Sequence, residues 1–313
     1  MPKMIFFSLC CTLFFSCNEL KNPSRPVLLE KEPGTFVTAK DRIKIFVYEY
    51  LPVSDYSCTV YIISGITGIN HHTEKEVIEL LANGKNRVVV IHPRGTGYSD
   101  GKRGDISVFS DFINDYVEII KCGRDYQSKQ HKTVLFGHSM SAAILLAVAD
   151  KLEHCDGAIL VNPPYQQKKA KGMSPTLLQY IKYASYMIFA KHKPVVNMAG
   201  NPALIENPED RKESEQRLND PLLVKYFSMY MMLESKKIMN LMLEFSKKAD
   251  YPLLLIYGEK DNIVDQKGCE LIFDRWKSDK KKYFIIENGT HGKSTVVSGK
   301  NIINKWINDI NNE

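Results

Sequence analysis

The feature that most constrains the fold is a repeated alternation between short apolar runs and segments long enough to form helices. Each run is rich in β-branched residues and apolar along its length, as expected of a strand buried on both faces. Such strands form parallel sheets whose connecting helices cover both faces. The sequence therefore predicts an α/β fold with a mostly parallel sheet. The runs occupy residues 58–64, 87–92, 133–136, 157–161, 252–257 and 282–286.

Two segments depart from this alternation. Residues 35–51 alternate apolar and polar side chains, which predicts a hairpin of half-buried strands. Residues 165–248 carry helix-like patterns of Met, Tyr and Leu and no strand run, which predicts an inserted helical cap. We therefore expect a core formed by residues 34–164 and 249–313. A chain of 313 residues with 44% hydrophobic content is long enough to bury such a core.

The N-terminus has the pattern of a secretory signal, because Lys3 precedes an apolar run over residues 4–15 that is too short to span a bilayer. The sequence LFFSC, which ends at Cys17, resembles a bacterial lipoprotein signal, in which the cysteine is lipidated. We therefore expect a signal over residues 1–17, a tether over residues 18–33 and a lipoprotein anchored to a membrane of a bacterial envelope. The alternatives are ordinary cleavage with secretion, or an uncleaved anchor.

Charge and cysteine usage favour neither nucleic-acid binding nor a metal site. The net charge of +6 is modest, and no interleaving of arginine with aromatic residues predicts a nucleic-acid surface. The scattered lysines predict a solvated surface, with weak attraction to an anionic membrane as the alternative. Beyond the signal, the four cysteines are far apart, and we expect Cys58 and Cys155 to be buried free thiols. His71 and His72 are expected to point apart on a helix, and they lack the spacing of metal ligands. We expect no metal and no cofactor.

Two glycine-containing loops resemble nucleotide-binding motifs but lack a required glycine. The sequence ENGTHGKST contains Gly-Lys-Ser, yet Glu287 stands where a phosphate loop has its first glycine and would repel phosphate. The sequence RGTGYSDG has Asp100 where a dinucleotide fingerprint has its third glycine. Neither loop predicts a nucleotide site.

The sequence VLFGHSMS, residues 134–141, has the pattern of a turn that presents a nucleophile. Ser139 follows a predicted strand and precedes the helix-like residues 141–150. Such a turn exposes the hydroxyl above the sheet and requires small neighbours, because strand and helix approach closely. Gly137 satisfies this requirement. Ser141 stands where the usual pattern has a second glycine, but its side chain adds only a hydroxymethyl group.

A nucleophilic serine requires a base and a carboxylate that orients the base. Asp261 and His291 each follow a predicted strand further along the chain. Taken singly, an aspartate after a strand is often a cap and a loop histidine is often only solvated. The order Ser, Asp, His, each on a loop after a strand, is the order found in the α/β-hydrolase fold.

From residue 35 to the C-terminus, the chain resembles the monoacylglycerol lipase and lysophospholipase branch of the α/β-hydrolases, which is serine aminopeptidase-like. The motifs that carry the resemblance are HPRGTGYSDGKRGD, FGHSMS, RLNDPL, YGEKDNIV and NGTHG. The resemblance implies an α/β-hydrolase fold with Ser139 as nucleophile, Asp261 as acid and His291 as base. It also implies an oxyanion hole formed by the backbone N–H groups of Ile66 and Met140.

The sequence departs from this family's pattern at three positions. Ser64 precedes Gly65 where the family has histidine, His92 replaces a strand-end aspartate, and Ser141 replaces a glycine. The first two departures are expected to shift the loop that carries Ile66. Because the loss of one oxyanion donor costs ~100–1000-fold in rate, we expect low activity or an unusual acyl group.

These motifs predict a serine hydrolase of carboxylic esters whose substrates are monoacyl lipids, either monoacylglycerol or lysophospholipid. The alternatives are a non-catalytic binding protein of the same fold, and a peptidase or amidase. Residues 177–190 and 226–245 are dense in Met, Tyr and Leu, as expected either of packing surfaces or of an acyl pocket. The expected partners are a small-molecule or lipid ester and a membrane, without nucleic acid, and the oligomeric state is left open.

Overall fold

The computed structural model describes residues 33–53, 55–68, 70–125, 131–168, 177–198 and 207–312. The expected signal, Cys17 and the tether up to residue 32 lie outside these ranges. Among the helices within these ranges, none combines the length and the apolar character needed to cross a membrane.

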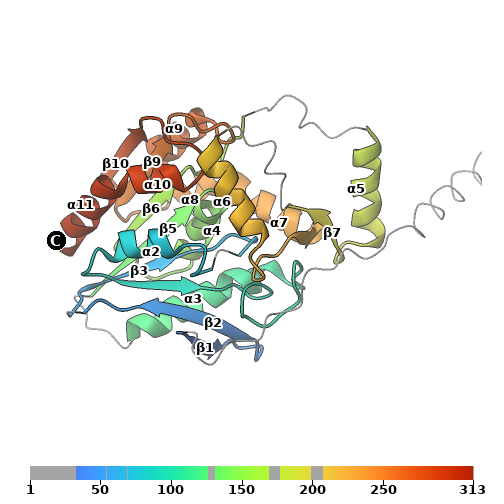
Figure 1. Ribbon diagram of the computed structural model, residues 1–313, viewed down its shortest axis with the longest axis horizontal. Helices are drawn as coiled ribbons and strands as arrows, with labels where there is room; N and C mark the ends of the chain where they lie inside the picture. The colour runs from blue at the N-terminus through green and yellow to red at the C-terminus, as the bar shows by residue number, and fades with distance from the viewer. Residues whose placement is uncertain are drawn as a thin grey trace, which may run out of the picture.

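The centre of the molecule is a sheet of eight strands (Figure 1). The strands are β1 (Thr35–Thr38), β2 (Lys44–Tyr50), β3 (Cys58–Ile62), β4 (Arg87–Ile91), β5 (Lys132–His138), β6 (Gly157–Val161), β9 (Leu253–Gly258) and β10 (Lys281–Ile286). They lie in the order β1-β2-β4-β3-β5-β6-β9-β10. β2 is antiparallel to both neighbours, and from β4 to β10 each strand is parallel to the next. The predicted N-terminal hairpin and mostly parallel sheet are confirmed.

Helices cover both faces of this sheet. They are α2 (Lys75–Ala82), α3 (Phe109–Asp125), α4 (Met140–Ala149), α9 (Gln266–Arg275), α10 (Lys293–Ser298) and α11 (Lys300–Asn311). Side chains of β9 alternate between two apolar clusters: Leu255 packs with α3, α4 and α9, whereas Leu254 packs with α2, α10 and α11. This alternation explains why the strand is apolar along its whole length. Cys58 and Cys155 are buried free thiols, as predicted.

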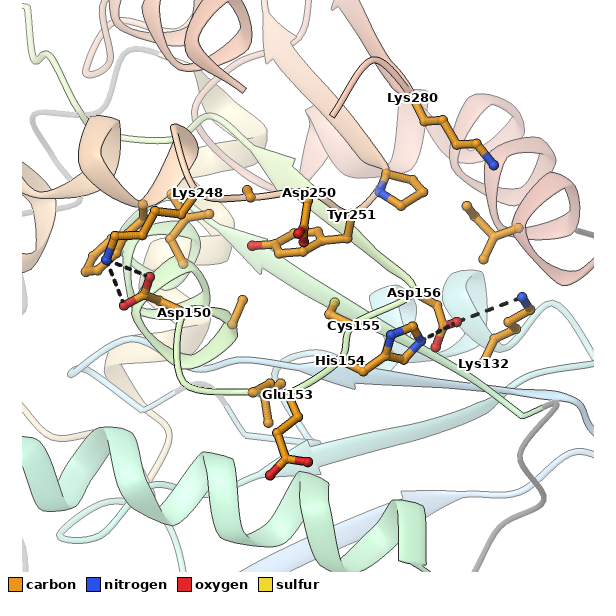
Figure 2. A pocket seen from close by; sticks show the side chains of 17 residues that line it. Lys132, Asp150, Glu153, His154, Cys155, Asp156, Lys248, Asp250, Tyr251 and Lys280 are labelled. Atoms are coloured by element: carbon orange, nitrogen blue, oxygen red, sulfur yellow. Dashed lines mark hydrogen bonds and ion pairs between the residues drawn. The ribbon is translucent and has the colours of Figure 1, made fainter. Parts of the chain in front are cut away.

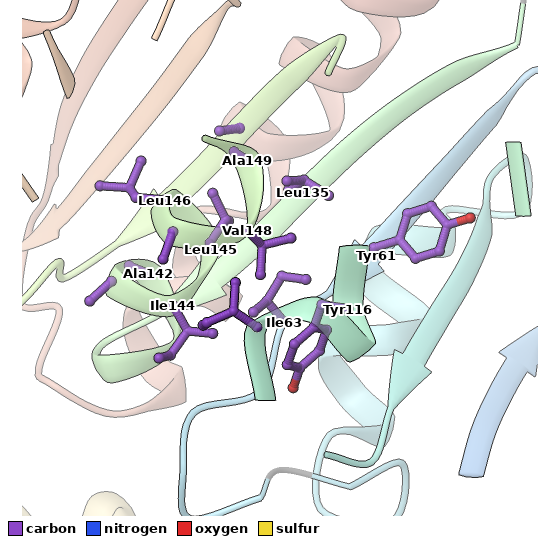
Figure 3. Packing of buried hydrophobic residues seen from close by; sticks show 14 of the residues in the cluster. Tyr61, Ile63, Tyr116, Leu135, Ala142, Ile144, Leu145, Leu146, Val148 and Ala149 are labelled. Carbon is purple, nitrogen blue, oxygen red and sulfur yellow. The ribbon is translucent and has the colours of Figure 1, made fainter. Parts of the chain in front are cut away.

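Helix α4, which begins directly after Ser139, is buried from Ser141 to Ala149. It lies between the sheet and helices that include α3, so that Leu145 and Val148 pack near Leu135 of β5 (Figure 3). A helix enclosed on all sides needs no polar face, which explains its uniformly apolar sequence. Its burial fixes the position of the turn at its N-terminus.

The strand order reverses between β3 and β5, which are neighbours in the sheet. From β3 the chain passes through α2 on one face, and from β5 it passes through α4 on the opposite face. The loops at the carboxyl ends of these two strands therefore diverge, and such a reversal is where open α/β sheets bind their ligands. The loops are those that carry Ile66 and Ser139.

The segment predicted as a helical cap contains α5 (Leu177–Phe189), β7 (Pro194–Asn197), α6 (Pro208–Leu218), β8 (Tyr226–Ser228), α7 (Met229–Asn240) and α8 (Met242–Ser246). The expectation that it holds no strand was wrong, because β7 and β8 pair in an antiparallel sheet. These strands have only four and three residues, too few to show an alternating pattern. α8 packs against α4 and α9 of the core, so the end of the predicted cap is part of the core packing.

Candidate active site

Ser139 lies in a strained turn between β5 and α4. Its φ of 54° and ψ of −128° are unusual for a residue with a side chain, as expected of a nucleophile held on a sharp strand-to-helix turn. A Cβ atom on Gly137 would lie 2.8 Å from the carbonyl oxygen of Ser141, so this position requires glycine. The structure has room for the side chain of Ser141, which is buried in the packing around the turn and only 6% exposed.

The structure brings Ser139, His291 and Asp261 into one hydrogen-bonded row. Nε2 of His291 lies 2.8 Å from Oγ of Ser139, and Nδ1 of His291 lies 2.8 Å from Oδ2 of Asp261. Because an ionised carboxylate only accepts hydrogen bonds, we assign the imidazole proton to Nδ1. Nε2 is then free to accept the serine proton. This arrangement can generate a serine nucleophile.

Asp261 is held in the ionised form by its hydrogen bonds. Its side chain is fully buried, and burial opposes ionisation. The hydrogen bond from His291 and the backbone N–H groups of Ile263 and Val264, each 2.8 Å from Oδ1, outweigh burial and hold the pKa of Asp261 below its usual value. The carboxylate can therefore stabilise an imidazolium on His291.

His138 lies beside the turn of Ser139 and also supports the loop that carries His291. Its Nε2 donates to the backbone carbonyl of His291 at 2.7 Å. Burial, followed by the neighbouring His291 ring, lowers the pKa of His138 to about 3. His138 therefore stays neutral and holds the loop through a fixed hydrogen bond. Sequence reasoning missed this role, although the position directly before Ser139 was a usable signal.

The loop after β3 lies against the turn of Ser139. The N–H of Gly68 donates to the carbonyl of Gly65 at 3.1 Å and closes a turn over Ile66. A Cβ atom on Gly65 would lie 3.2 Å from Cγ of Met140, so the two proposed oxyanion donors belong to segments in close contact.

Tyr116 of α3 and Ser64 support the loop after β3. The Tyr116 hydroxyl donates to the carbonyl of Ser64 and accepts from its N–H, both at 3.1 Å. The Ser64 hydroxyl donates to the carbonyl of Ile91 at 3.3 Å. The serine that replaces the family's histidine is thus tied to α3 and β4, and the loop that carries Ile66 remains beside the turn.

His92 takes over the place of the family's aspartate as a buried, neutral hydrogen-bonding group. Its Nδ1 accepts from the N–H of Tyr98, and its Nε2 lies 3.2 Å from Nδ1 of His71. Burial, reinforced by His71 and His72, holds the pKa of His92 well below its usual value. The prediction that His71 and His72 point apart on a helix was wrong, because they precede α2 and their ring centroids are 4.1 Å apart.

The cap reaches the histidine loop through α6. Oγ1 of Thr290 donates to Asp210 at 2.9 Å. Lys293 forms ion pairs with Glu213 at 3.8 Å and with the buried Glu74 at 3.6 Å. The lysine of the GKS sequence is therefore paired with carboxylates from α6 and from the start of α2. In the part of the chain that the structure describes, no cluster of His, Cys, Asp or Glu is placed to hold a metal ion.

A cleft of about 760 Å³ lies at the amino ends of the strands, at the edge of the sheet opposite Ser139 (Figure 2). Its lining includes Lys132 at the amino end of β5, whereas Ser139 follows the carboxyl end of the same strand. Its charged groups are largely paired, as in the contact of Lys248 with Asp150 at 3.0 Å. The cleft is therefore remote from the Ser–His–Asp row.

Comparison with known proteins identifies relatives with the same fold. The family described as serine aminopeptidase, S33, matches residues 57–293. Monoglyceride lipase from Rattus norvegicus is 25% identical over 209 residues, which are 63% of this chain and 63% of the relative, just under two thirds of its length. Monoglyceride lipase from Homo sapiens is 24% identical over 236 residues, 71% of each chain.

Among solved structures, a soluble variant of monoglyceride lipase from Saccharomyces cerevisiae, in complex with a substrate analog, aligns with a TM-score of 0.74. The identity is 16%, and the alignment covers 91% of this chain and 98% of that chain. This likeness shows the fold. Together with the sequence relatives, it confirms the predicted resemblance to the monoacylglycerol lipase branch. The chain belongs to the serine aminopeptidase S33 family of α/β-hydrolases.

Proposed function

We propose that this protein is a carboxylic ester hydrolase that works through an acyl-enzyme on Ser139. The observation that carries the proposal is the row in which His291 lies 2.8 Å from both Ser139 and Asp261. The strained turn at Ser139 supports a catalytic protein over a non-catalytic binding protein, since a binding protein has no need for strain at an aligned nucleophile.

In this mechanism, Nε2 of His291 takes the proton of the Ser139 hydroxyl as Oγ attacks the ester carbonyl. The negative charge on the tetrahedral intermediate is stabilised by the N–H groups of Ile66 and Met140. His291 returns the proton to the departing alcohol, which leaves an acyl group on Ser139. Water, deprotonated by His291, then attacks the acyl carbon, and His291 passes that proton to Oγ of Ser139 as the acid leaves. Asp261 stabilises the imidazolium throughout.

The proposed substrates are monoacyl lipids, with monoacylglycerol ahead of lysophospholipid. The sequence relatives are monoglyceride lipases, and the structural neighbour was solved with a substrate analog. Half-buried Met232 of α7 and neighbouring apolar residues of the cap supply flexible apolar surface near the core. A peptidase or amidase is the second candidate, favoured by the family description.

A panel of substrates tests both candidates. We expect the wild-type protein to react with a fluorophosphonate probe, and its kcat/KM to rise along p-nitrophenyl esters from acetate toward long chains and to be high for a monoacylglycerol. A steady fall from acetate onward would reject the lipid substrate. Faster cleavage of aminoacyl p-nitroanilides than of any ester would instead favour the peptidase.

We also propose that Cys17 is lipidated and anchors the protein to a bacterial envelope membrane. Support comes from the basic start, the short apolar run and the sequence LFFSC. Each buried CH₂ of an acyl chain contributes ~0.8 kcal/mol, so more than one chain holds the protein stably. Wild-type protein should incorporate palmitate and enter the detergent phase, and Cys17→Ala should do neither. Mature wild-type protein in the medium, starting after Cys17, would favour secretion.

A further inference from the structure

A buried asparagine connects the loop of the catalytic acid to the loop of the catalytic histidine. Asn162 directly follows β6 and is completely buried. Its Nδ2 donates to the carbonyl of Thr290 at 3.0 Å, and its Oδ1 accepts from the N–H of Gly258 at 2.8 Å. One amide side chain therefore uses both of its ends to join two other segments.

The two groups that Asn162 binds are close in sequence to the catalytic pair. Gly258 ends β9, three residues before Asp261, and Thr290 directly precedes His291. The separation between the acid loop and the histidine loop is thus set in part by the length of one amide. A misplacement of catalytic groups by ~1 Å can cost ~100-fold in rate, so this spacing matters for turnover.

The backbone of Asn162 is adapted to this position. Its φ of 46° lies in the left-handed region, which asparagine adopts more readily than most residues with a side chain. Its N–H donates to the carbonyl of Ile256 at 2.9 Å, which continues the pairing of β6 with β9. The turn directs the side chain across the end of β9 toward the histidine loop.

Packing at Gly258 is a second contact between these loops, beside the hydrogen bond from the N–H of Lys260 to the carbonyl of Gly289 at 2.7 Å. A Cβ atom there would lie 2.6 Å from the carbonyl oxygen of Thr290 and 2.7 Å from that of Gly289. The end of β9 is therefore pressed against the histidine loop. The Thr290 carbonyl also accepts from Oγ1 of Thr295 at 2.6 Å. This carbonyl is therefore held by two donors, the Thr295 hydroxyl and the Asn162 amide.

We propose that Asn162 is a positioning residue that sets the distance and orientation between Asp261 and His291 by bridging Gly258 and Thr290. The inference deepens the proposed function and rests on it. Asn162 does not touch the reacting atoms. Its effect is expected in the rate of the chemical step, because substrate binding depends on other surfaces of the site.

Asn162→Gly is the principal test, because glycine accepts the left-handed backbone and removes only the bridge. We expect kcat for a p-nitrophenyl ester to fall about 10–100-fold while KM stays within about twofold. The rate of fluorophosphonate labelling should fall in parallel. Asn162→Asp keeps the size and the acceptor but loses the donor to Thr290, and should lower kcat without the empty space left by glycine.

Asn86 provides a matched control. It is buried, and its Nδ2 donates to a backbone carbonyl, that of Leu81, at 2.8 Å. It lies next to the amino end of β4, at the edge of the sheet opposite the triad. Asn86→Gly should therefore lower the melting temperature to an extent similar to Asn162→Gly and leave kcat unchanged.

The outcomes separate this inference from the proposed function. Wild-type kcat in either folded Asn162 variant, or an equal loss of kcat in Asn86→Gly, would overturn the positioning role while the wild-type protein remains an active hydrolase. If the wild-type protein itself neither labels nor hydrolyses esters, the proposed function fails instead. If Asn162→Gly does not fold, Asn162→Asp alone decides.

Discussion

The two halves of the proposed catalytic edge are supported by different kinds of contact. The loops after β5, β9 and β10 are linked by backbone hydrogen bonds, from the N–H of Ser139 to Val161 at 2.9 Å and from that of Lys260 to Gly289 at 2.7 Å, together with the side-chain bridges of His138 and Asn162. The loops after β3 and β4 also contain backbone hydrogen bonds, but the positions that depart from the family pattern are held by side chains, with the Tyr116 hydroxyl on Ser64 and the His92 ring against Tyr98.

This difference explains where the chain can depart from the pattern of its family. Two of the three departures, Ser64 and His92, lie in the half supported by side chains. There, neighbouring rings and hydroxyl groups can be rebuilt around a new residue. In the other half the only departure is Ser141, a small side chain that the helix buries. The backbone hydrogen bonds of that half do not depend on side-chain identity, whereas its bridges from His138 and Asn162 do, and Gly137 leaves no room for a larger side chain.

The largest expected effect is the loss of the nucleophile in the backbone-supported half. Ser139→Ala should lower kcat by at least about 10⁴-fold and abolish fluorophosphonate labelling, because among the described residues it is the Ser139 hydroxyl that is hydrogen-bonded to Nε2 of His291. The measurement is ester hydrolysis by the purified variant, with an unchanged circular dichroism spectrum as the control for folding. Undiminished hydrolysis would sink the assignment of Ser139.

A smaller effect is expected where the two halves touch. Gly65→Ala places a Cβ atom 3.2 Å from Cγ of Met140 and 3.5 Å from the N of Ser141, which should push the Ile66 loop away from the turn. Because one oxyanion donor contributes ~100–1000-fold, partial displacement should lower kcat about 10–100-fold.

Gly84 offers the control for this substitution. A Cβ atom there meets nothing within 4 Å, and its φ of +70° is tolerated by asparagine. Gly84→Asn should therefore retain wild-type kcat. If Gly65→Ala is as active as Gly84→Asn, Ile66 does not supply an oxyanion donor in the manner proposed.

The side-chain-supported half should be sensitive to acid. Burial holds the pKa of His92 well below its usual value, so below about pH 6.5 the unfolded chain binds a proton that the folded protein resists. Stability is therefore lost as the pH falls. His92→Asn removes this titration, and its unfolding free energy should fall less than that of wild type between pH 7.5 and pH 5, by up to about 2 kcal/mol.

Urea unfolding at the two pH values measures this difference. Glu74 and Asp115, whose pKa values burial raises, act in the opposite direction. They remain in both proteins, so the comparison cancels their direct contributions. Parallel pH dependences of wild type and His92→Asn would refute the buried, neutral histidine.

The smallest expected effect concerns the cap. Met232 of α7 is half-buried, and Met232→Asp should reduce the preference for long over short p-nitrophenyl esters by about 3–10-fold, since a charge opposes an apolar chain. Leu233, which is 40% exposed on the same helix, supplies the control Leu233→Asp. If the preference for long esters is unchanged in both variants, α7 does not line the acyl pocket.

Met231 directly precedes Met232 and cannot be distinguished from it by the apolar pattern, but it has a different environment. It is 2% exposed in the core cluster that also contains α4. Met231→Asp should therefore destabilise the fold rather than change the acyl preference. The dense apolar character of residues 226–245 arises because β8, α7 and α8 each bury a face of their own.

Much of the fold and the hydrogen-bonded row of Ser139, His291 and Asp261 could be predicted because their signals are local. A buried parallel strand is apolar along its length, so the run at residues 157–161 coincides with β6. Ser139, Asp261 and His291 each follow such a strand, and the carboxyl ends of parallel strands meet at one edge of the sheet. The order of these residues therefore predicted their proximity before any contact was known.

The tertiary structure alone decided which other side chains serve that row. Asn162 and Thr290 are separated by 128 residues, and Tyr116 and Ser64 by 52, so no periodicity links either pair. The pairing of β7 with β8 and the contact of His92 with His71 likewise depend on how distant segments pack. By itself the sequence determined the strands of the central sheet, their order of attachment to helices and the three catalytic candidates. The support around them depends on hydrogen-bond geometry, which exists only once the chain is folded.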